Sequence, residues 1–450
     1  MELVALVKHD CPVCDQVLPA LDRARALGAP VRILSQSSAA ETAEQASRLK
    51  LGAQPELDVD LELSARLDPE AVPAVVLLDG GAEQGRVEGI DRERLAELAA
   101  RAGVTLELDG LPERRPGCAS VTRDYRIAAT LAARAARASG RLRARELAIG
   151  ELEDEFEALF DRGFSDGLPV VPPTPERVVQ MLDATTRHAQ DLVAVVPPYD
   201  GRATVEKVAI NAVMAGCPPA VLPIVLAAAE AACDPAFALL GVVATTYPAA
   251  PVIVVSGPLA ERVGMNSAGN ALGQGNRANA TIGRALQLVV RNVGGARPQY
   301  EDSATHGQAG KFGASFAERL HDSPWPGLAQ DRFVPTDETG VTLIAAEGPR
   351  TFADLQARTA DDLCASLRPE LEWVGYQSAL LVVGPDLGKL FREAGWDRAR
   401  VRRELSGPGE DQILLAHAGG DAGRFAMIYR GWVGGDAGSQ PVTRSVTPWL

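Results

Sequence analysis

Apolar and polar segments alternate along the first hundred residues, and this pattern predicts strands and helices in alternation. An apolar run at residues 3–8 stops at the tetrapeptide CPVC, and a helical pattern follows to about residue 26. The next predicted elements are a strand at 30–35, a helix at 40–51, a strand within 71–81, a short strand at 85–89 and a helix at 91–103. A βαβ unit followed by two strands and a helix indicates an α/β domain over residues 1–103.

Residues 104–159 have a different character. A Pro- and Gly-bearing stretch, DGLPERRPGCAS, precedes a segment rich in Ala and Arg at 126–148. Ala and Arg are strong helix formers, so we predict a linker with one or two exposed helices. Cys118 lies in this linker and could be a thiol within reach of CPVC. A lone cysteine carries little information, and an ordinary loop cysteine is the favoured interpretation.

Internal similarity marks the rest of the chain. Three pairs of segments match in the same order, which predicts two similar α/β halves at 160–335 and 336–450. The pairs are 193–217 with 341–364, 251–264 with 379–395, and 309–316 with 422–429.

The first half carries a Gly-, Asn- and Ser-rich insertion at 264–298 that has no counterpart after Gly395. Backbone N–H groups freed by glycines, together with the start of a helix near residue 279, predict an anion pocket. A long structural loop is the alternative. The predicted substrate-binding residues of the insertion are Asn266, Ser267, Asn276, Arg277 and Asn279.

A second polar stretch, EDSATHGQAGKFG at 301–313, follows the insertion. Here we predict His306 as a proton donor and Lys311 as a point charge beside a developing negative centre. Asp302 and Thr305 are predicted to bind substrate. In the second half, Gly419 stands at the position of His306 and Arg424 at that of Lys311. We therefore predict one site between the halves, formed by the polar residues of the first half and joined by Arg424. A histidine that only fixes its own loop is the alternative interpretation.

The CPVC sequence defines the candidate chemistry of the first domain. A cysteine at a helix start is stabilised as thiolate by the helix dipole, so Cys11 is the predicted nucleophile and Cys14 the resolving thiol. CPVC after the first strand, with Val72-Pro73 before the third, resembles glutaredoxin-like proteins of the thioredoxin-like fold over residues 1–103. The resemblance implies a cis bond before Pro73 and a catalytic position for Pro73 against CPVC.

The chain departs from the glutathione-binding pattern of that family. Val13 replaces an aromatic residue, Val72 replaces a threonine, and EGID at 88–91 replaces a Gly-Gly-Asp pattern. We therefore predict a thiol or dithiol reductase system as partner rather than glutathione. No nucleotide or flavin motif is visible, so no cofactor beyond a thiol reductant is expected. The alternative is capture of a soft metal or metalloid by the two thiols, with a non-redox lyase or carrier domain attached.

Composition narrows the remaining classes of function. A net charge of −14 argues against binding to nucleic acid or to an anionic membrane, and no apolar run is long enough to span a bilayer. Six cysteines without a second CxxC predict no structural zinc, and the absence of an apolar leader predicts a cytoplasmic protein. The region after residue 160 resembles an uncharacterised bacterial family, which implies no chemistry. The expected fold is a thioredoxin-like domain joined by a helical linker to a larger, duplicated α/β domain that binds a small anionic substrate.

Overall fold

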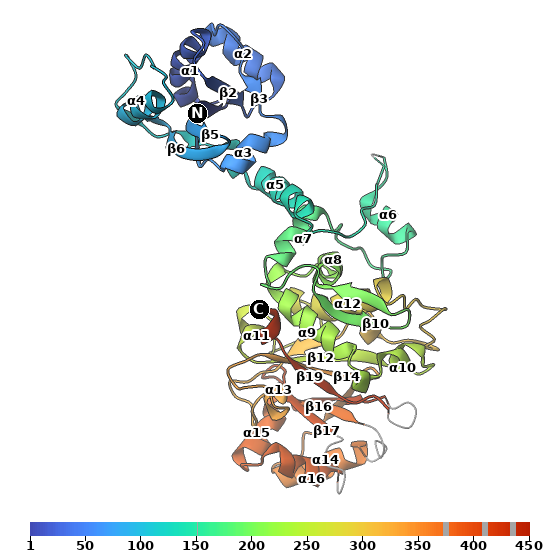
Figure 1. Ribbon diagram of the computed structural model, residues 1–450. Helices are drawn as coiled ribbons and strands as arrows, with labels where there is room; N and C mark the ends of the chain where they lie inside the picture. Colours follow the sequence, from blue (N-terminus) through green and yellow to red (C-terminus); the bar gives the residue numbers. More distant parts are fainter. Residues whose placement is uncertain (151, 372–377, 407–412, 433–437) are drawn as a thin grey trace. The chain divides into compact units, whose positions relative to one another are not determined.

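The computed structural model describes residues 1–150, 152–371, 378–406, 413–432 and 438–450 (Figure 1). The chain forms two compact units, Met1–Ala135 and Ala136–Leu450. The first unit extends past the predicted boundary at residue 103, because the segment that follows adds two short strands to it.

The first unit is built on a five-stranded mixed sheet of order β3-β2-β1-β5-β6. Its central strand, β1, is apolar and buried from Leu3 to Val7, since helices cover both of its faces. Strand β1 is parallel to β2 and antiparallel to β5. This mixed α/β arrangement agrees with the order of strands and helices that the sequence predicts. The strands are β1 (Glu2–Val7), β2 (Val31–Ser35), β3 (Glu56–Leu57), β5 (Ala74–Asp79) and β6 (Ala82–Glu88).

Helices α1, α2 and α4 of this unit each begin at a side-chain N-cap, which satisfies backbone N–H groups that have no partner inside the helix. The Cys11 sulfur caps α1, Asp91 caps α4, and Ser38 caps α2 in a reciprocal pair with Glu41. The helices are α1 (Pro12–Ala26), α2 (Ala39–Leu49), α3 (Glu62–Leu67) and α4 (Arg92–Arg101).

Residues 113–123, here called the strap, run back along the first unit. Strand β8 (Arg114–Arg115) pairs with β7 (Ile90–Asp91), and β9 (Cys118–Ala119) pairs with β4 (Ala71–Val72). The predicted Ala- and Arg-rich helix follows as α5 (Tyr125–Ala138). Residues 141–150 are not helical, in contrast to the sequence-based expectation.

The second unit contains two four-stranded sheets of order β13-β12-β14-β19 and β15-β18-β16-β17, and a hairpin of β10 and β11. Helices α8, α9 and α12 pack into its largest apolar core. The strands are β10 (Leu192–Val196), β11 (Gly201–Thr204), β12 (Ala250–Ser256), β13 (Ser315–Ala317), β14 (Gly340–Ala346), β15 (Arg350–Ala353), β16 (Ala379–Val383), β17 (Ile413–His417), β18 (Phe425–Arg430) and β19 (Val442–Ser445). The helices are α6 (Glu155–Asp161), α7 (Pro175–Leu182), α8 (Val205–Ala215), α9 (Leu222–Ala232), α10 (Leu239–Ala244), α11 (Pro258–Arg262), α12 (Arg277–Asn292), α13 (Leu328–Asp331), α14 (Ala360–Leu371), α15 (Pro385–Glu393) and α16 (Arg398–Ser406).

The described residues contain no single helix with the length and hydropathy needed to cross a membrane. One pair, Pro219–Ala232 and Pro235–Ala244, meets those criteria only when taken together, and it is bent by 70°. All but one of the α9 residues lie in the interior of the second unit.

The segments matched in the sequence form related but unequal structures. Strand β12 leads into α11 much as β16 leads into α15. The third matched pair differs, because β13 is parallel to β12 whereas β18 is antiparallel to β16. The internal duplication therefore stays a prediction.

Candidate functional site

The CPVC sequence lies where β1 ends and α1 begins. Cys11 is the N-cap of α1, and its Sγ accepts a hydrogen bond from the Cys14 N–H at 3.1 Å. Pro12 occupies the first helical turn, where its missing N–H costs no hydrogen bond. Cys14, one turn into the helix, is completely buried.

The surroundings of the two thiols separate their acidities. The pKa of Cys11 is lowered from 9.0 to about 6, chiefly because the Cys14 thiol donates a hydrogen bond to its sulfur. Burial opposes this effect, while the Cys14 N–H and the Cys118 thiol add to it. Burial raises the pKa of Cys14 far above its usual range, and the adjacent Cys11 sulfur raises it further. Cys11 is therefore the thiolate near neutral pH, and Cys14 stays protonated.

The loop before β5 forms the opposite wall of the site. The Val72–Pro73 peptide bond is cis, as the resemblance implies. The Cys11 Sγ lies 3.4 Å from the carbonyl oxygen of Val72, to which the thiol form donates. The structure therefore brings Cys11, Cys14 and the Val72–Pro73 loop together.

Cys118 lies in the same site, which corrects its interpretation as an ordinary loop cysteine. It is directly opposite Val72 in the β4–β9 pair, and the Val72 carbonyl oxygen lies 3.4 Å from the Cys11 Sγ. The neighbouring Cys118 thiol helps to lower the pKa of Cys11. Burial and the neighbouring Cys11 sulfur raise the pKa of Cys118. Periodicity could not favour this placement over a loop, because the pairing joins two-residue strands in which the paired Val72 and Cys118 are 46 positions apart.

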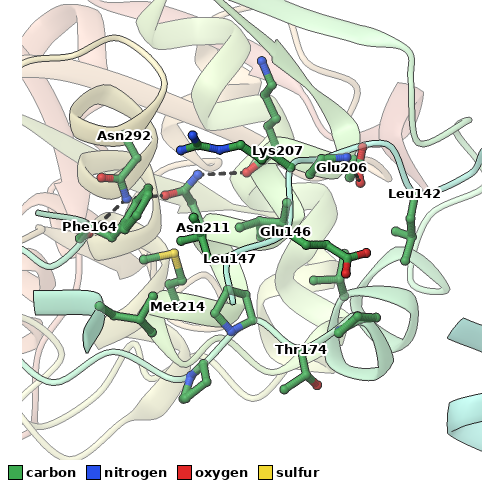
Figure 2. Close-up of a pocket in the computed structure, with 18 of the residues that line it drawn as sticks. Leu142, Glu146, Leu147, Phe164, Thr174, Glu206, Lys207, Asn211, Met214 and Asn292 are labelled. Carbon is green, nitrogen blue, oxygen red and sulfur yellow. Dashed lines mark hydrogen bonds between the residues drawn. The ribbon is translucent and has the colours of Figure 1, made fainter. Parts of the chain in front are cut away.

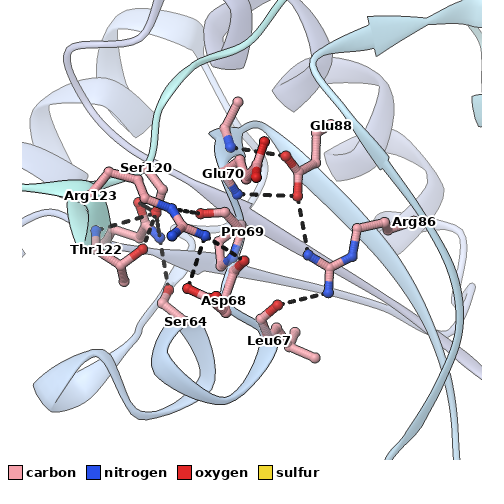
Figure 3. A network of polar contacts seen from close by, with 12 residues as sticks. Ser64, Leu67, Asp68, Pro69, Glu70, Arg86, Glu88, Ser120, Thr122 and Arg123 are labelled. Atoms are coloured by element: carbon pink, nitrogen blue, oxygen red, sulfur yellow. Dashed lines mark hydrogen bonds and ion pairs between the residues drawn. The ribbon is translucent and has the colours of Figure 1, made fainter. Parts of the chain in front are cut away.

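Polar side chains fix the loop before the cis-proline in place (Figure 3). Arg123 donates to the carbonyl oxygens of Asp68 and Pro69 at 3.0 and 3.3 Å. The Glu88 carboxylate accepts the N–H groups of residues 70 and 71 at 3.3 and 3.0 Å. Glu88 marks one of the departures from the glutathione-binding pattern, and here it has a structural role.

A buried network lies beneath the strap. The Gln36 amide donates to the hydroxyls of Ser64 and Ser120 at 2.8 and 2.9 Å, and its oxygen accepts the Val121 N–H at 3.1 Å. Gln36, Ser64 and Ser120 are each less than a tenth exposed. Because losing a partner of a buried polar group costs about 1–3 kcal/mol, this network holds the strap firmly on the first unit.

In the second unit, the asparagines of the predicted anion pocket contact one another. The Asn279 side chain is buried; it accepts the Asn266 N–H at 3.0 Å and donates to the carbonyl oxygens of Asn266 and Ala271 at 2.7 and 3.0 Å. Asn276 is the N-cap of α12 and accepts the Asn279 N–H at 3.0 Å. These amides fix the conformation of the Gly-rich insertion.

Other predicted substrate contacts also bind backbone groups. Arg277 donates to the carbonyl oxygens of Gly216 and Cys217 at 2.7 and 3.4 Å, so it caps the end of α8. The Ser267 carbonyl accepts the Gly419 N–H at 2.9 Å, which joins the insertion to the loop after β17. Arg424 donates to the Ala357 carbonyl oxygen at 2.6 Å.

The predicted acid/base stretch contains one close pair. Lys311 lies 2.8 Å from the Asp302 carboxylate, and both line a cavity of about 30 Å³. That volume holds about one water molecule rather than a metabolite. Thr305 and His306 are exposed, and the Thr305 N–H donates to the Thr246 carbonyl oxygen at 3.0 Å. The anion site predicted at these residues is not tested by these contacts and stays a prediction.

A larger pocket, of about 500 Å³, lies elsewhere in the second unit (Figure 2). Its volume is in the range typical of small-molecule sites. Apolar side chains such as Leu142, Phe164 and Met214 form much of its wall. Arg145 and Lys207 also line it. The non-helical segment 141–150 supplies one side, which explains why helix propensity gave no signal for this pocket.

The polar groups of this pocket are largely paired within the protein. Asn292 donates to the Asn211 oxygen at 2.8 Å, and Asn211 donates to the Lys207 carbonyl oxygen at 2.9 Å (Figure 2). The buried Glu206 carboxylate accepts the N–H groups of Arg143 and residue 144 at 2.8 and 2.9 Å. Glu206 thus ties the segment 141–150 to α8.

A buried charge cluster lies where strands of the two sheets end. The Glu318 carboxylate, which follows β13, accepts the Ser256 hydroxyl at 2.5 Å and lies 3.5 Å from the Arg398 guanidinium. Both charged side chains are almost completely buried. Burial raises the pKa of Glu318, and Arg398 opposes that shift. The ion pair and the hydrogen bond to Ser256 join β12, the end of β13 and α16. Separating Glu318 from Arg398 would leave a buried charge without a partner, which would destabilise the folded protein.

Within the described parts of the chain, no group of three or more His, Cys, Asp or Glu side chains is arranged to hold a metal ion.

No family model matches the sequence, and no curated protein matches it either. Several solved structures, including the following two, are similar to part of the chain. One is a secreted Mycobacterium tuberculosis disulfide oxidoreductase homologous to E. coli DsbE, with 18% identity, a TM-score of 0.20, and coverage of 22% of this chain and 80% of that one. The other is StoA from Bacillus subtilis, with 19% identity, a TM-score of 0.19, and coverage of 22% and 80%.

Proposed function

We propose that the first unit is a thiol–disulfide oxidoreductase that exchanges electrons through Cys11 and Cys14. The observation that carries this proposal is the placement of Cys11 at the N-cap of α1, with its pKa lowered to about 6 beside a buried, protonated Cys14. The Cys11 thiolate attacks a partner disulfide, forms a mixed disulfide and releases one partner thiolate. Cys14 then attacks Cys11, closes the Cys11–Cys14 disulfide and releases the second partner thiolate.

The partner in this proposal is a dithiol or a thiol reductase system rather than glutathione. An extended peptide that binds by backbone pairing needs a free strand edge. The edge of β4 beside the cis-proline is already paired with β9 of the strap. Glutathione would therefore have to displace the strap, whereas a partner that attacks a sulfur directly would not.

A turnover assay tests this function. The full chain should catalyse the reduction of a disulfide-linked fluorescent peptide by dithiothreitol. At equal thiol concentration, this catalysed rate should exceed the catalysed rate with glutathione as the reductant. Cys11→Ser should abolish catalysis, while Cys233→Ser, in the second unit, should retain it. Catalysis that survives in Cys11→Ser, or equal turnover with glutathione, would contradict the respective part of the proposal. A parallel titration with arsenite tests the alternative, capture of a metalloid by the thiols.

For the second unit, a small anionic substrate is the proposal. The 500 Å³ pocket supports it, because the pocket has the volume for a small molecule and Arg145 and Lys207 line it. The insertion around Arg277, together with the following stretch around His306, is the second position for the same ligand. Binding of small carboxylates and phosphates should be compared among Arg145→Ala, Arg277→Ala and His306→Ala. Loss of binding in Arg145→Ala alone supports the pocket, and loss in the other two variants supports the insertion.

A further inference from the structure

Three sulfurs, rather than two, meet at the redox site, and they differ in accessibility. Cys11 is 1% exposed and Cys14 is 0% exposed, whereas Cys118 is partly exposed. A dithiol or disulfide partner protein therefore contacts Cys118 before either thiol of CPVC. Thiol–disulfide exchange requires direct access to a sulfur atom, so this order of exposure matters for the route of electrons.

The position of Cys118 is fixed by close backbone packing. A Cβ atom on Gly117 would lie 2.6 Å from the Val72 carbonyl oxygen and 3.0 Å from the Ala71 side chain. Gly89, with a φ of +76°, also approaches the strap closely, because a Cβ atom on it would lie 2.6 Å from the Gly117 N–H nitrogen. Glycine at these two positions lets the strap approach the cis-proline loop closely enough to form the β4–β9 pair.

We propose that Cys118 is a third redox thiol, which forms a disulfide with Cys11 by exchange with the Cys11–Cys14 disulfide. This inference rests on the redox function proposed above. The Cys118 thiolate attacks the Cys11 Sγ, so that the Cys11–Cys118 bond forms and the Cys11–Cys14 bond breaks. Cys14 leaves as a thiolate and takes up the proton that Cys118 released. The exchange consumes neither an oxidant nor a reductant.

The second disulfide gives an external dithiol a route to the buried pair. The partner attacks the Cys118 Sγ and releases Cys11, which leaves readily because a thiol of low pKa is a good leaving group. The second thiol of the partner then attacks the partner sulfur bound to Cys118 and closes the partner's own disulfide. Cys118 is released as a thiol, so one dithiol is oxidised and one protein disulfide is reduced.

Disulfide mapping of the full-length chain tests the bond itself. Cys14→Ser is oxidised with diamide, and the monomer is isolated, alkylated in acid, digested and analysed by mass spectrometry. We expect a cross-linked peptide pair that contains Cys11 and Cys118, and no such pair in Cys14→Ser/Cys118→Ser. If Cys118 remains a free thiol in oxidised Cys14→Ser while the wild type forms Cys11–Cys14, the inference is overturned and the proposed function stands. If the wild type forms no disulfide at Cys11, the proposed function fails as well.

The rate of reduction tests the route. A positioned thiol has an effective concentration far above that of a millimolar reductant, so oxidised Cys118→Ser should be reduced by dithiothreitol at least about tenfold more slowly than the wild type. Gly117→Ala should slow reduction in the same direction while all six thiols remain. Gly52→Ala is the matched control, since its Cβ would meet only the Asp22 carboxylate at 3.5 Å. Equal rates in the wild type, Cys118→Ser and Gly117→Ala would overturn the route through Cys118.

Discussion

Removal of the Cys14 side chain is the sharpest perturbation of the Cys11 thiolate. In Cys14→Ala the N–H donor to Cys11 remains, but the thiol donor, the largest cause of the lowered pKa, is lost. A hydrogen bond to a charged group is worth about 1.5–3 kcal/mol, which corresponds to about 1–2 pH units. With a pKa of about 6, Cys11 is ionised to about 90% at pH 7, against about 1% for a thiol of pKa 9.0. The variant should therefore titrate at least about one pH unit higher than the wild type.

Ultraviolet absorbance of the thiolate, followed from pH 4 to pH 9, measures this midpoint directly. The other thiols do not interfere, because burial raises the pKa of Cys217, Cys233 and Cys364 to about 12 and also raises those of Cys14 and Cys118. Alkylation rates alone are less decisive. A thiolate of low pKa is intrinsically less nucleophilic, by roughly 20-fold for a difference of three units. An absorbance midpoint near pH 9 in the wild type, or equal midpoints in the wild type and Cys14→Ala, would refute the reasoning.

Three further predictions concern stability. The pKa of Cys11 is lower in the folded protein than in the unfolded chain, so its contribution to the free energy of unfolding is lost as pH falls through about 6. Between about pH 6 and pH 9, the free energy of unfolding of the reduced wild type should therefore rise relative to that of Cys11→Ser by roughly 1 kcal/mol per pH unit. Asn279→Ala removes three hydrogen bonds of a buried amide and should cost roughly 2–3 kcal/mol in denaturant unfolding, whereas exposed Gln274→Ala should cost less than about 1 kcal/mol; equal costs would contradict the structural role of Asn279. Arg398→Met leaves the Glu318 carboxylate buried without its cation and should lower the free energy of unfolding by about 3–5 kcal/mol. The decrease should be smaller at pH 5 than at pH 8, because a protonated carboxyl costs less to bury. A decrease that does not depend on pH would contradict this account.

The sequence predicted the first unit well because its information is local. Alternating apolar runs and CPVC each act over a few residues, and they correctly placed β1 and α1. The cis bond before Pro73 was implied by the resemblance to glutaredoxin-like proteins, not by a local pattern. Cys118 was misjudged because its role depends on pairing between distant two-residue strands, and such short strands have no periodic signal. Distant contacts also explain why the pocket lined by residues 141–150 was not predicted. Hydrogen bonds to Glu206 hold this segment in a non-helical conformation, although Ala and Arg favour a helix.

In the second unit, residue types alone were ambiguous. Asparagine, arginine and glycine in a long loop are equally suited to binding an anion and to holding the loop together. The structure shows that Asn279 and Arg277 form bonds within the fold, which a sequence cannot reveal. The Lys311–Asp302 pair shows the same effect, since both charges predicted for a substrate face each other.

Redox titration of the full chain tests the central claim most directly. The protein is equilibrated in dithiothreitol buffers of graded potential, quenched in acid and alkylated, and the state of Cys11 and Cys14 is read by mass spectrometry. We predict one reversible two-electron transition in which Cys11 loses its free thiol together with either Cys14 or Cys118, while Cys217, Cys233 and Cys364 remain reduced throughout. If Cys11 and Cys14 stay alkylatable across the whole range of potentials, the account of this protein as a thiol–disulfide oxidoreductase is contradicted.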